Sequence, residues 1–374
     1  MSGIAWADIY VSELGSDDTG DGSEVSPYRT ITKALSSLGA ETAITVGAGL
    51  YNPDAGEVFP LTVPVGVSIF GTMGDEENEL DSTVIDAGGT ANAFVLPQTT
   101  AEAPNTFSDL VVTGALGTAF DASAGNWPGT IDGCVIKEVA NTDPSATAAA
   151  LFAVSSNVTI TDTTIRDINS TAPYIVRVQT SPGSLLIEDC TFQNLRCTGA
   201  TNNGSCVVSV TSSNLPLTIR RSAFDNANGL MTQYDPAGSQ RGAVVTGRNS
   251  FLIDACIFRN ISYATCGAVV LGYNTTYTVQ NSLFHNITAG NVNWYGQNVN
   301  FGVIGTHYNT STWRNCTFDA CSSVVGHTQV YGTPRLYNCS VTSVPRKPFT
   351  TGISRQFVLS TRSTCKVGHC CWQR

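Results

Sequence analysis

The chain has 374 residues, of which 13% are charged and 42% are hydrophobic, and its formal net charge is −10 at pH 7. This composition argues against a disordered chain, and the 19 Lys and Arg residues form no basic stripe that would bind nucleic acid. No apolar run approaches the roughly 20 residues of a membrane-spanning helix, so we expect no transmembrane helix.

Residues 9–71 form a unit with a distinctive order of segments. The segments are IYVS at 9–12, GSDDTGDGS at 15–23, SPYRTITKAL at 26–35, ITVGAGLY at 44–51, GEVFPLTVP at 56–64 and GVSIFG at 66–71. This order resembles the N-terminal unit of right-handed parallel β-helix proteins of the pectin-lyase-like superfamily. Its continuation is similar to a secreted β-helix domain of unknown function. The resemblance covers about a sixth of the chain and implies a fold without specifying an activity.

A short helix is predicted inside this unit. Ser26 is the expected N-cap and Pro27 the expected first helical residue. The apolar residues that follow fall on one helical face and are Ile31, Ala34, Leu35 and Leu38. Because the open end of a solenoid exposes core and unpaired strand edges, we expect residues 27–38 to cap that end.

Acidic residues gather just before this helix and are the candidate metal ligands. They are Asp17, Asp18, Asp21 and Glu24. Ca²⁺ takes several carboxylate and carbonyl oxygens from flexible loops. The alternative is a solvated turn whose Asp and Gly residues serve backbone geometry. Calcium is the one cofactor that the sequence suggests, and the predicted fold requires none.

From about residue 105 a phrase recurs that predicts a repeat architecture. It starts with an apolar residue, passes through a small residue that is often Cys, and ends with a large apolar residue, a polar residue and often Asn. Clear copies span 160–167, 187–194, 219–226, 253–260, 279–286 and 313–320. Their large apolar residues are separated by 27, 32, 34, 26 and 34 residues. A period of about 20 to 50 residues indicates a solenoid, propeller or array.

The local pattern identifies the type of solenoid. In the copy at 187–194, Ile187, Cys190 and Phe192 alternate as inward residues, and the alternation breaks at Asp189, where we expect a turn. The segments are rich in β-branched residues, Asn and Gly, which disfavours helical repeats. The sequence therefore predicts an all-β, single-stranded parallel β-helix of ten or eleven coils about 4.8 Å apart. The resemblance of residues 9–71 to right-handed β-helix proteins implies that this β-helix is right-handed.

Stacked coils convert each repeated position into a column. The large apolar position predicts an internal aromatic stack of Phe192, Phe224, Phe258, Phe284 and Phe318. The small position predicts a buried column of Cys134, Cys190, Cys256, Cys316 and Cys339, with Thr163, Ser222 and Ser282 between them. The polar end predicts an internal turn column of stacked amides at Asn194, Asn226, Asn260 and Asn286. Runs of small and β-branched residues at 241–245, 266–270 and 301–304 predict a second buried strand in each coil.

These patterns set the expected organisation of the chain. Residues 1–345 form one β-helix, with a cap over about 1–40, irregular first coils to about 104 and regular coils over 105–345. Residues 1–143 have a net charge of −18 and residues 144–345 a net charge of +2. Residues 346–374 carry six bases and no acid, and form a basic tail or a C-terminal cap.

The resemblance implies that polysaccharide lyase activity should be considered, because lyases are among the enzymes with this fold. A lyase needs a base beside a uronate carboxyl that a cation neutralises. Lys137 is the only lysine on a central coil, and Asp132, Glu138 and Arg166 occupy neighbouring outer positions. Lys137 and Arg166 are therefore the candidate catalytic residues, and the alternative is a solvated face of alternating charge. The four histidines have no evident triad partner, and the hydrolase and esterase motifs of this fold are missing.

Sequons and cysteines bear on the compartment. Nine Asn-x-Ser/Thr sequons occur, and those at Asn260, Asn286, Asn315 and Asn338 are interpreted as structural. The candidate glycosylation sites are Asn157, Asn169, Asn203, Asn274 and Asn309. The column cysteines are interpreted as small buried apolar residues, whereas disulfides joining Cys316 to Cys321 or Cys197 to Cys206 are the alternative for a secreted protein. No signal peptide opens the chain, so it is either intracellular or an excised segment of a secreted protein.

We favour an extracellular or cell-surface glycoprotein with an adhesive, structural or carbohydrate-binding role. Its partner would be a polysaccharide or a cell-surface glycan, and we expect no nucleic-acid partner. The alternative is a carbohydrate-active enzyme, namely a polysaccharide lyase acting on an acidic glycan. The sequence does not predict the oligomeric state.

Overall fold

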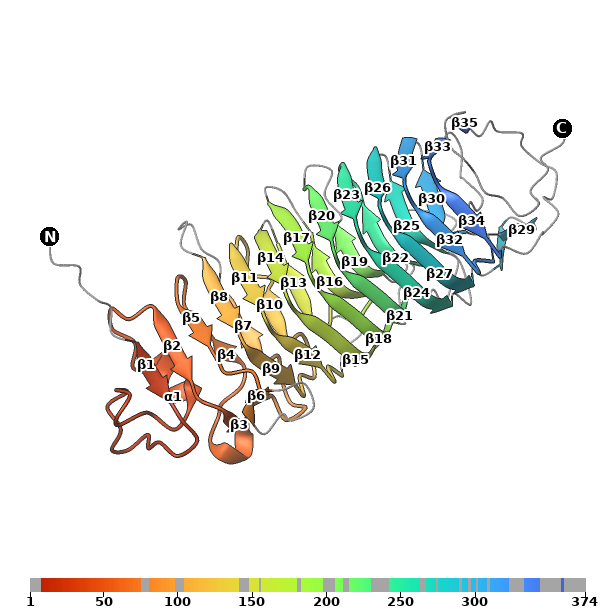
Figure 1. Cartoon of the computed structure of the whole chain (residues 1–374). Coiled ribbons are helices and arrows are strands. Elements are labelled where there is room, and N and C mark those ends of the chain that lie inside the picture. Colours follow the sequence, from red (N-terminus) through yellow and green to blue (C-terminus); the bar gives the residue numbers. More distant parts are fainter. Residues whose placement is uncertain are drawn as a thin grey trace, which may run out of the picture.

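The computed structural model describes the chain from residue 8 to 359 with gaps. The described residues are 8–74, 81–97, 104–140, 148–154, 156–179, 183–197, 206–210, 215–229, 242–262, 267–273, 275–288, 291–294, 297–300, 302–307, 310–322, 333–343 and 358–359. Within them, three long parallel sheets of thirteen, eleven and nine strands run along one rod (Figure 1). These are called below the thirteen-stranded, eleven-stranded and nine-stranded sheets.

Each sheet is built from one strand per coil. The thirteen-stranded sheet contains β1 (Ile9–Val11), β2 (Ala43–Val46), β5 (Ser68–Phe70), β8 (Asn105–Ser108), β11 (Gly129–Asp132), β14 (Asn157–Thr161), β17 (Ser184–Glu188), β20 (Leu217–Arg220), β23 (Phe251–Asp254), β26 (Tyr277–Gln280), β31 (Thr310–Arg314), β33 (Thr333–Tyr337) and β35 (Val358–Leu359). The eleven-stranded sheet contains β3 (Gly49–Tyr51), β6 (Thr83–Asp86), β9 (Leu110–Thr113), β12 (Val135–Lys137), β15 (Thr164–Ser170), β18 (Thr191–Cys197), β21 (Ala223–Gly229), β24 (Ile257–Ser262), β27 (Leu283–Thr288), β32 (Thr317–Asp319) and β34 (Ser340–Thr342).

The third sheet closes the coils. It contains β4 (Leu61–Thr62), β7 (Phe94–Val95), β10 (Phe120–Ala122), β13 (Leu151–Ala153), β16 (Tyr174–Val178), β19 (Cys206–Val210), β22 (Gly242–Gly247), β25 (Gly267–Tyr273) and β30 (Ile304–His307). Strands β22 and β25 coincide with the runs at 241–245 and 266–270, which confirms the predicted second strand in those coils. Strand β30 begins only at Ile304, the last residue of the run at 301–304. A separate antiparallel pair consists of β28 (Asn291–Trp294) and β29 (Gln297–Asn300). The architecture is the predicted right-handed parallel β-helix.

From β8 to β33, one residue in the left-handed region lies between each strand of the thirteen-stranded sheet and the next strand of the eleven-stranded sheet. Asp189 lies at this bend with φ 54°, which confirms the predicted turn. The other bend residues have φ between 47° and 59° and are Asp109, Gly133, Asp162, Arg221, Ala255, Asn281, Asn315 and Asn338. Asn, Asp and Gly predominate because they tolerate this backbone region best.

The predicted aromatic stack lies in the core. Ring centroids of successive members from Phe192 to Phe318 are 4.5, 4.7, 4.9 and 5.2 Å apart, with interplanar angles between 3° and 15°. All five side chains are fully buried. The inter-coil spacing therefore matches the offset stacking distance of aromatic rings.

The small column is buried as predicted except at Cys339, which is half-buried, and each of its side chains donates to a backbone carbonyl. Cys190 Sγ lies 3.1 Å from the carbonyl oxygen of Glu188, and the hydroxyl of Ser222 donates to Arg220 at 2.9 Å. The N–H of Cys190 in turn donates to Ser222 Oγ in the next coil, at 3.1 Å. The eight cysteines within the described ranges are free thiols, so Cys197 and Cys206, and Cys316 and Cys321, are not joined.

The N-terminal helix differs from the prediction in where it begins. Helix α1 spans Ile31–Ser36, its N-cap is Thr30, and Ser26 lies before it in an isolated bridge, so the predicted Ser26 cap is wrong. The carboxylate of Asp17 accepts the N–H groups of Arg29 and Thr30, at 2.8 and 3.0 Å.

A second acid, Glu57, comes from a distant segment and accepts hydrogen bonds at the N-terminus of this helix. The carboxylate of Glu57 accepts from Ile31 at 2.6 Å and from Thr32 at 2.9 Å, and burial raises its pKa. Ile31 and Ala34 are buried, and Leu35 and Leu38 pack against the core, so the helix does cover the coil end as expected. A 3₁₀ turn at Pro53–Ala55 follows in the first coils. No helix among the residues described has the length and apolarity to cross a membrane.

Candidate functional site

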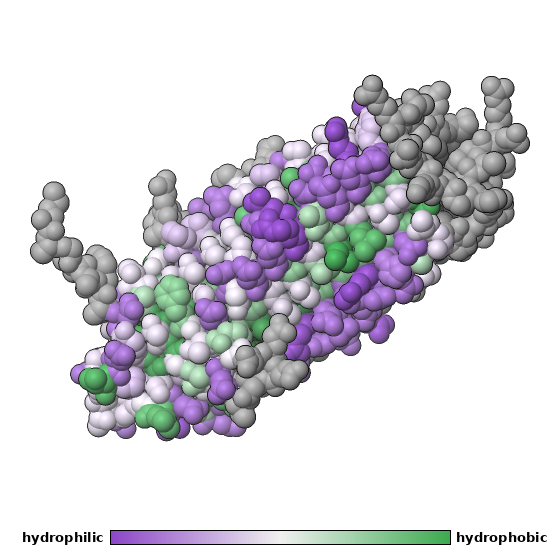
Figure 2. Space-filling view, viewed as in Figure 1, coloured by the Kyte–Doolittle hydropathy of each residue, from purple (hydrophilic) through white to green (hydrophobic). Residues whose placement is uncertain are grey.

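The outward side of the eleven-stranded sheet carries a continuous column of polar side chains. Strand register places them on successive coils in the order Lys137, Arg166, Gln193, Asp225, Arg259, His285, Asp319 and Thr342. We call this set the outer column. Each member from Gln193 to Asp319 directly follows a residue of the Phe stack, so strand alternation turns it away from the core. Hydrophilic side chains gather in bands along the rod (Figure 2).

Ion pairing holds the middle of the outer column in a fixed orientation. Arg259 Nε and Nη2 each lie 2.8 Å from Asp225 Oδ2 on the preceding coil. The other carboxylate oxygen of Asp225 accepts from the amide of Asn260 at 2.8 Å. The Arg259 side chain remains 52% exposed, so its remaining donors face solvent.

A histidine pairs with an aspartate near the C-terminal end of the column. His285 Nδ1 lies 3.0 Å from Asp319 Oδ2, and Thr342 donates to Asp319 Oδ1 at 2.7 Å. Both hydrogen bonds lower the pKa of the Asp319 carboxyl, and the one from Thr342 has the larger effect. His285 therefore has an acidic partner that the sequence did not reveal. The two residues are one coil apart but 34 residues apart in sequence.

The predicted amide column flanks the outer column and corrects one expectation. Asn226 donates to Asn194 at 3.2 Å, and Asn286 donates to Asn260 at 2.8 Å, which confirms amide stacking. All four Asn residues are exposed rather than internal. They have φ between 50° and 55°, and this left-handed residue reverses the alternation that the strand pattern predicts.

A second amide ladder was not predicted from the sequence. At the bend between sheets, Asn315 donates to Asn281 at 3.1 Å and Asn338 donates to Asn315 at 2.7 Å. Its sequence signal is position, because each Asn immediately precedes a residue of the small column. These contacts give the side chains of Asn315 and Asn338 a structural role, in line with the interpretation of their sequons as structural.

The structure brings together part of the proposed lyase set. Lys137 and Arg166 are register neighbours on β12 and β15. Arg166 Nη1 lies 2.7 Å from Asp167 Oδ2, and the hydrogen bond from Asn194 to Asp167, together with Arg166, lowers the pKa of that carboxyl. Asp132, by contrast, lies on β11 of the thirteen-stranded sheet.

The remaining lyase candidates have other partners. Thr161 donates to Asp132 Oδ1 at 2.5 Å. Glu138 Oε2 accepts from Thr113 Oγ1 at 3.3 Å. The outward cation pair is therefore Lys137 with Arg166, and Asp132 belongs to a different face of the rod.

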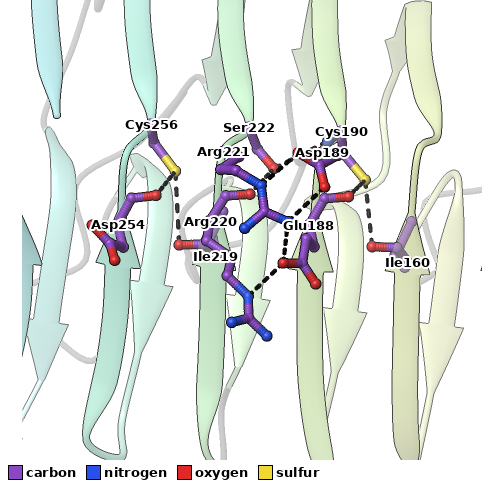
Figure 3. A network of polar contacts seen from close by, with 10 residues as sticks. All are labelled: Ile160, Glu188, Asp189, Cys190, Ile219, Arg220, Arg221, Ser222, Asp254 and Cys256. Atoms are coloured by element: carbon purple, nitrogen blue, oxygen red, sulfur yellow. Dashed lines mark hydrogen bonds and ion pairs between the residues drawn. The ribbon is translucent and has the colours of Figure 1, made fainter. Parts of the chain in front are cut away.

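A compact charge cluster lies on the thirteen-stranded sheet, beside the Cys column (Figure 3). Arg221 binds Asp189 through two hydrogen bonds, at 2.8 and 2.7 Å, and also contacts Glu188. Arg220 Nε lies 2.8 Å from Glu188 Oε1. The hydrogen bonds from Arg221 lower the pKa of Asp189. Two acids and two bases neutralise one another here, which is typical of a structural network.

The nine-stranded sheet carries a partly buried cation. The Arg177 guanidinium lies 4.4 Å from the centroid of the Tyr174 ring, and burial lowers its pKa. Its register neighbour is Ser209 on β19. Arg177 Nε and Ser209 Oγ are both buried polar atoms without a hydrogen-bond partner. No sequence pattern indicated this pair.

The proposed calcium ligands do not converge. Asp17 serves the helix N-terminus, and Asp21 Oδ1 accepts from Ser23 at 3.0 Å. Asp18 and Glu24 are exposed. Within the described ranges, no group of three or more His, Cys, Asp or Glu side chains could hold a metal ion.

Two of the five candidate glycosylation sites lie within the described residues. Asn157 on β14 and Asn169 on β15 are both exposed. Asn157 Oδ1 accepts from Ser184 Oγ at 3.0 Å. The other three candidates, Asn203, Asn274 and Asn309, lie outside the described residues.

The stacked coils, single-residue bends and buried ladders define a parallel β-helix of the pectin-lyase-like class. The chain belongs to the family described as a protein of unknown function, DUF1565, which matches residues 14–215. No curated protein matches the chain.

Two solved structures of similar fold are complexes with sugars. The catalytic domain of a GH87 α-1,3-glucanase in complex with nigerose is 13% identical, with a TM-score of 0.48 over 90% of this chain and 67% of that one. The complex of XylC with xylose is 10% identical, with a TM-score of 0.47 over 90% of this chain and 75% of that one. Similarity of this degree does not extend to activity.

Proposed function

We propose that the chain is an extracellular or cell-surface β-helix that binds glycans through the outer column without catalysing their cleavage. The observation that carries this proposal is the continuous row of outward-facing hydrogen-bonding side chains, one per coil, on the eleven-stranded sheet. Successive members are separated by the strand spacing of about 4.8 Å. A polysaccharide lying along the rod would meet a new polar group at each step.

The contacts inside the column support binding more than acid–base catalysis. Asp225 and Asp319 are each oriented by two neighbouring donors, which lowers the ordering cost of binding a sugar hydroxyl. The pKa of Asp319 is lowered, so this carboxylate stays ionised and accepts hydrogen bonds. A general acid needs the opposite shift.

Two arginines provide a matched test of this surface. Arg259 in the outer column and Arg220 on the thirteen-stranded sheet each lie 2.8 Å from a carboxylate one coil away, and their side chains are 52% and 42% exposed. We expect Arg259→Ala to lose glycan signals on an array that the wild-type chain binds, whereas Arg220→Ala retains them. Equal loss in the two variants would place the binding surface elsewhere.

Exposed sequons support the extracellular part of the proposal. Asn157 and Asn169 are accessible to glycan transfer if the chain passes through a secretory route. Expression in a secreting eukaryotic host, followed by glycosidase treatment and mass spectrometry, should show glycan on these two residues. Unmodified Asn157 and Asn169 in secreted material would contradict the assignment of these two residues as glycosylation sites.

The second candidate function is a polysaccharide lyase acting on an acidic glycan. It is favoured by the adjacency of Lys137 and Arg166, where one cation could hold a uronate carboxylate while the Lys137 amine accepts the neighbouring ring proton. Elimination would break the glycosidic C–O bond and leave a double bond in the new chain end. Incubation with uronate polymers, with and without Ca²⁺, tests this by ultraviolet absorbance. If the wild-type chain cleaves these polymers and Lys137→Ala does not, the lyase assignment replaces the proposal of binding without cleavage.

A further inference from the structure

The small column of the core alternates between thiols and hydroxyls over most of its length. In coil order it reads Cys134, Thr163, Cys190, Ser222, Cys256, Ser282, Cys316 and Cys339. The last step breaks the alternation. Among the described members of this column, Cys316 and Cys339 are the pair of thiols on directly adjacent coils.

The flanking strands hold these two cysteines in register. Arg314 pairs with Tyr337 before the bend, and Thr317 pairs with Ser340 after it. Parallel strands lie about 4.8 Å apart, within the roughly 4.4–6.8 Å between Cα atoms that a disulfide needs. Both thiols point the same way, because each lies near the carbonyl oxygen two residues before it, at 3.3 Å for Cys316 and 3.4 Å for Cys339.

The hydrogen-bond pattern of the column also places the two thiols on neighbouring coils. In the preceding coils a column cysteine donates its N–H to a hydroxyl of the next coil, as Cys256 does to Ser282 Oγ at 3.1 Å. At the last step the strand register places Cys339 Sγ at the position of that hydroxyl, on the coil next to Cys316. Hydrogen bonding from Cys316 lowers the pKa of the Cys339 thiol. Cys316 is buried and Cys339 is half-buried, so Cys339 is the thiol that a dissolved reagent reaches first.

We propose that Cys316 and Cys339 form a disulfide that joins adjacent C-terminal coils, by exchange with a low-molecular-weight disulfide such as oxidised glutathione. The Cys339 thiolate attacks one sulfur of the small disulfide, forms a mixed disulfide and releases one small thiolate. The Cys316 thiol then loses its proton and attacks Cys339 Sγ, which releases the second small thiol. The two protein thiols lose two electrons, which reduce the small disulfide to two thiols.

This cross-link would act at the edge of the eleven-stranded sheet. Its last strand among the described residues is β34, which pairs only with β32, so its stability depends on a single strand interface. A disulfide between β31–β32 and β33–β34 restricts the unfolded chain and keeps the two coils together. The inference does not rest on glycan binding.

Peptide mapping of the oxidised full chain tests the proposal. The purified protein is incubated with oxidised glutathione, its remaining thiols are alkylated, and it is digested without reduction. We expect a cross-linked peptide pair containing Cys316 and Cys339, lighter by two hydrogen atoms than the separate reduced peptides and split by dithiothreitol. Cys339→Ser installs the residue found at 222 and 282 and should abolish the pair. Cys256→Ser, at a thiol flanked by hydroxyls, should retain it.

The wild-type result decides the matter without relying on any variant to fold. Recovery of Cys316 and Cys339 as alkylated peptides after oxidation would overturn the proposal. A cross-link from Cys316 to Cys321, or to another cysteine, would overturn it equally.

Discussion

The two faces of the eleven-stranded sheet follow different rules, although their residues alternate along the same strands. The inner face repeats one residue, Phe, over the coils from 192 to 318, because each ring must stack on the next at 4.5 to 5.2 Å. The outer face has Gln193, Asp225, Arg259, His285 and Asp319 at the adjacent positions. Packing therefore fixes the inner face, whereas the outer face is free to carry chemistry particular to this chain.

Truncating one ring should give the largest effect and sharpen this contrast. Phe258→Ala leaves a cavity between two stacked rings, and we expect a loss of about 3–5 kcal/mol in the free energy of unfolding. The next residue supplies the control, since Arg259→Ala removes an exposed ion pair and should cost no more than about 1 kcal/mol. Urea denaturation measures both. Similar losses in the two variants would show that the outer face also carries the fold.

A smaller loss is expected from the thiol–hydroxyl column. Ser222→Ala removes the acceptor of the Cys190 N–H and the donor to the Arg220 carbonyl, so we expect a cost of about 1–3 kcal/mol. Ser222→Cys restores a side chain of the kind found at neighbouring coils and should recover part of that loss. The same denaturation assay compares them. An alanine variant as stable as wild type would show that these hydrogen bonds are not needed.

In the exposed amide column, substitutions should change stability more through the backbone conformation than through the loss of amide hydrogen bonds. Asn260 has φ 55°, so Asn260→Val forces a β-branched residue into the left-handed region, at a cost of about 1–2 kcal/mol. Asn260→Gly, which accepts this φ, should cost less, although both variants lose the same hydrogen bonds. Equal destabilisation would assign the effect to the amide ladder instead.

The smallest expected effect is the pH dependence of stability that Asp319 contributes. The pKa of Asp319 is lowered in the fold, so its contribution to stability is present above the ordinary carboxyl pKa of about 4 and is lost as pH falls through the folded value. The thermal midpoint of wild type should exceed that of Asp319→Asn near neutral pH, and the difference should shrink in strong acid. A difference that does not change with pH would contradict the assignment.

The fold was predictable because its repeats are local. The phrase around Asp189 shows the strand, the bend and the next strand within eight residues, so the Phe and Cys columns follow from spacing alone. The helix cap was mispredicted because its acceptors, Asp17 and Glu57, come from other segments. The amide column was placed inside because alternation was extended through a residue whose left-handed φ reverses it.

The candidate site was predictable only in part. Lys137 and Arg166 were found as neighbours, since their coils follow one another in the repeat. The pairing of His285 with Asp319 depends on the register of two coils separated by a longer loop. The charges that neutralise Arg220 and Arg221 likewise become visible only when coils are stacked (Figure 3).

Binding measured by calorimetry tests the central claim most directly. The wild-type chain, Arg259→Ala and Arg220→Ala are titrated with a glycan that the wild-type chain retains on an array. The account predicts that Arg259→Ala weakens binding by about tenfold or more, as expected for loss of a charged hydrogen bond, and that Arg220→Ala binds like wild type. Wild-type affinity in Arg259→Ala, or cleavage of the glycan during the titration, would contradict it.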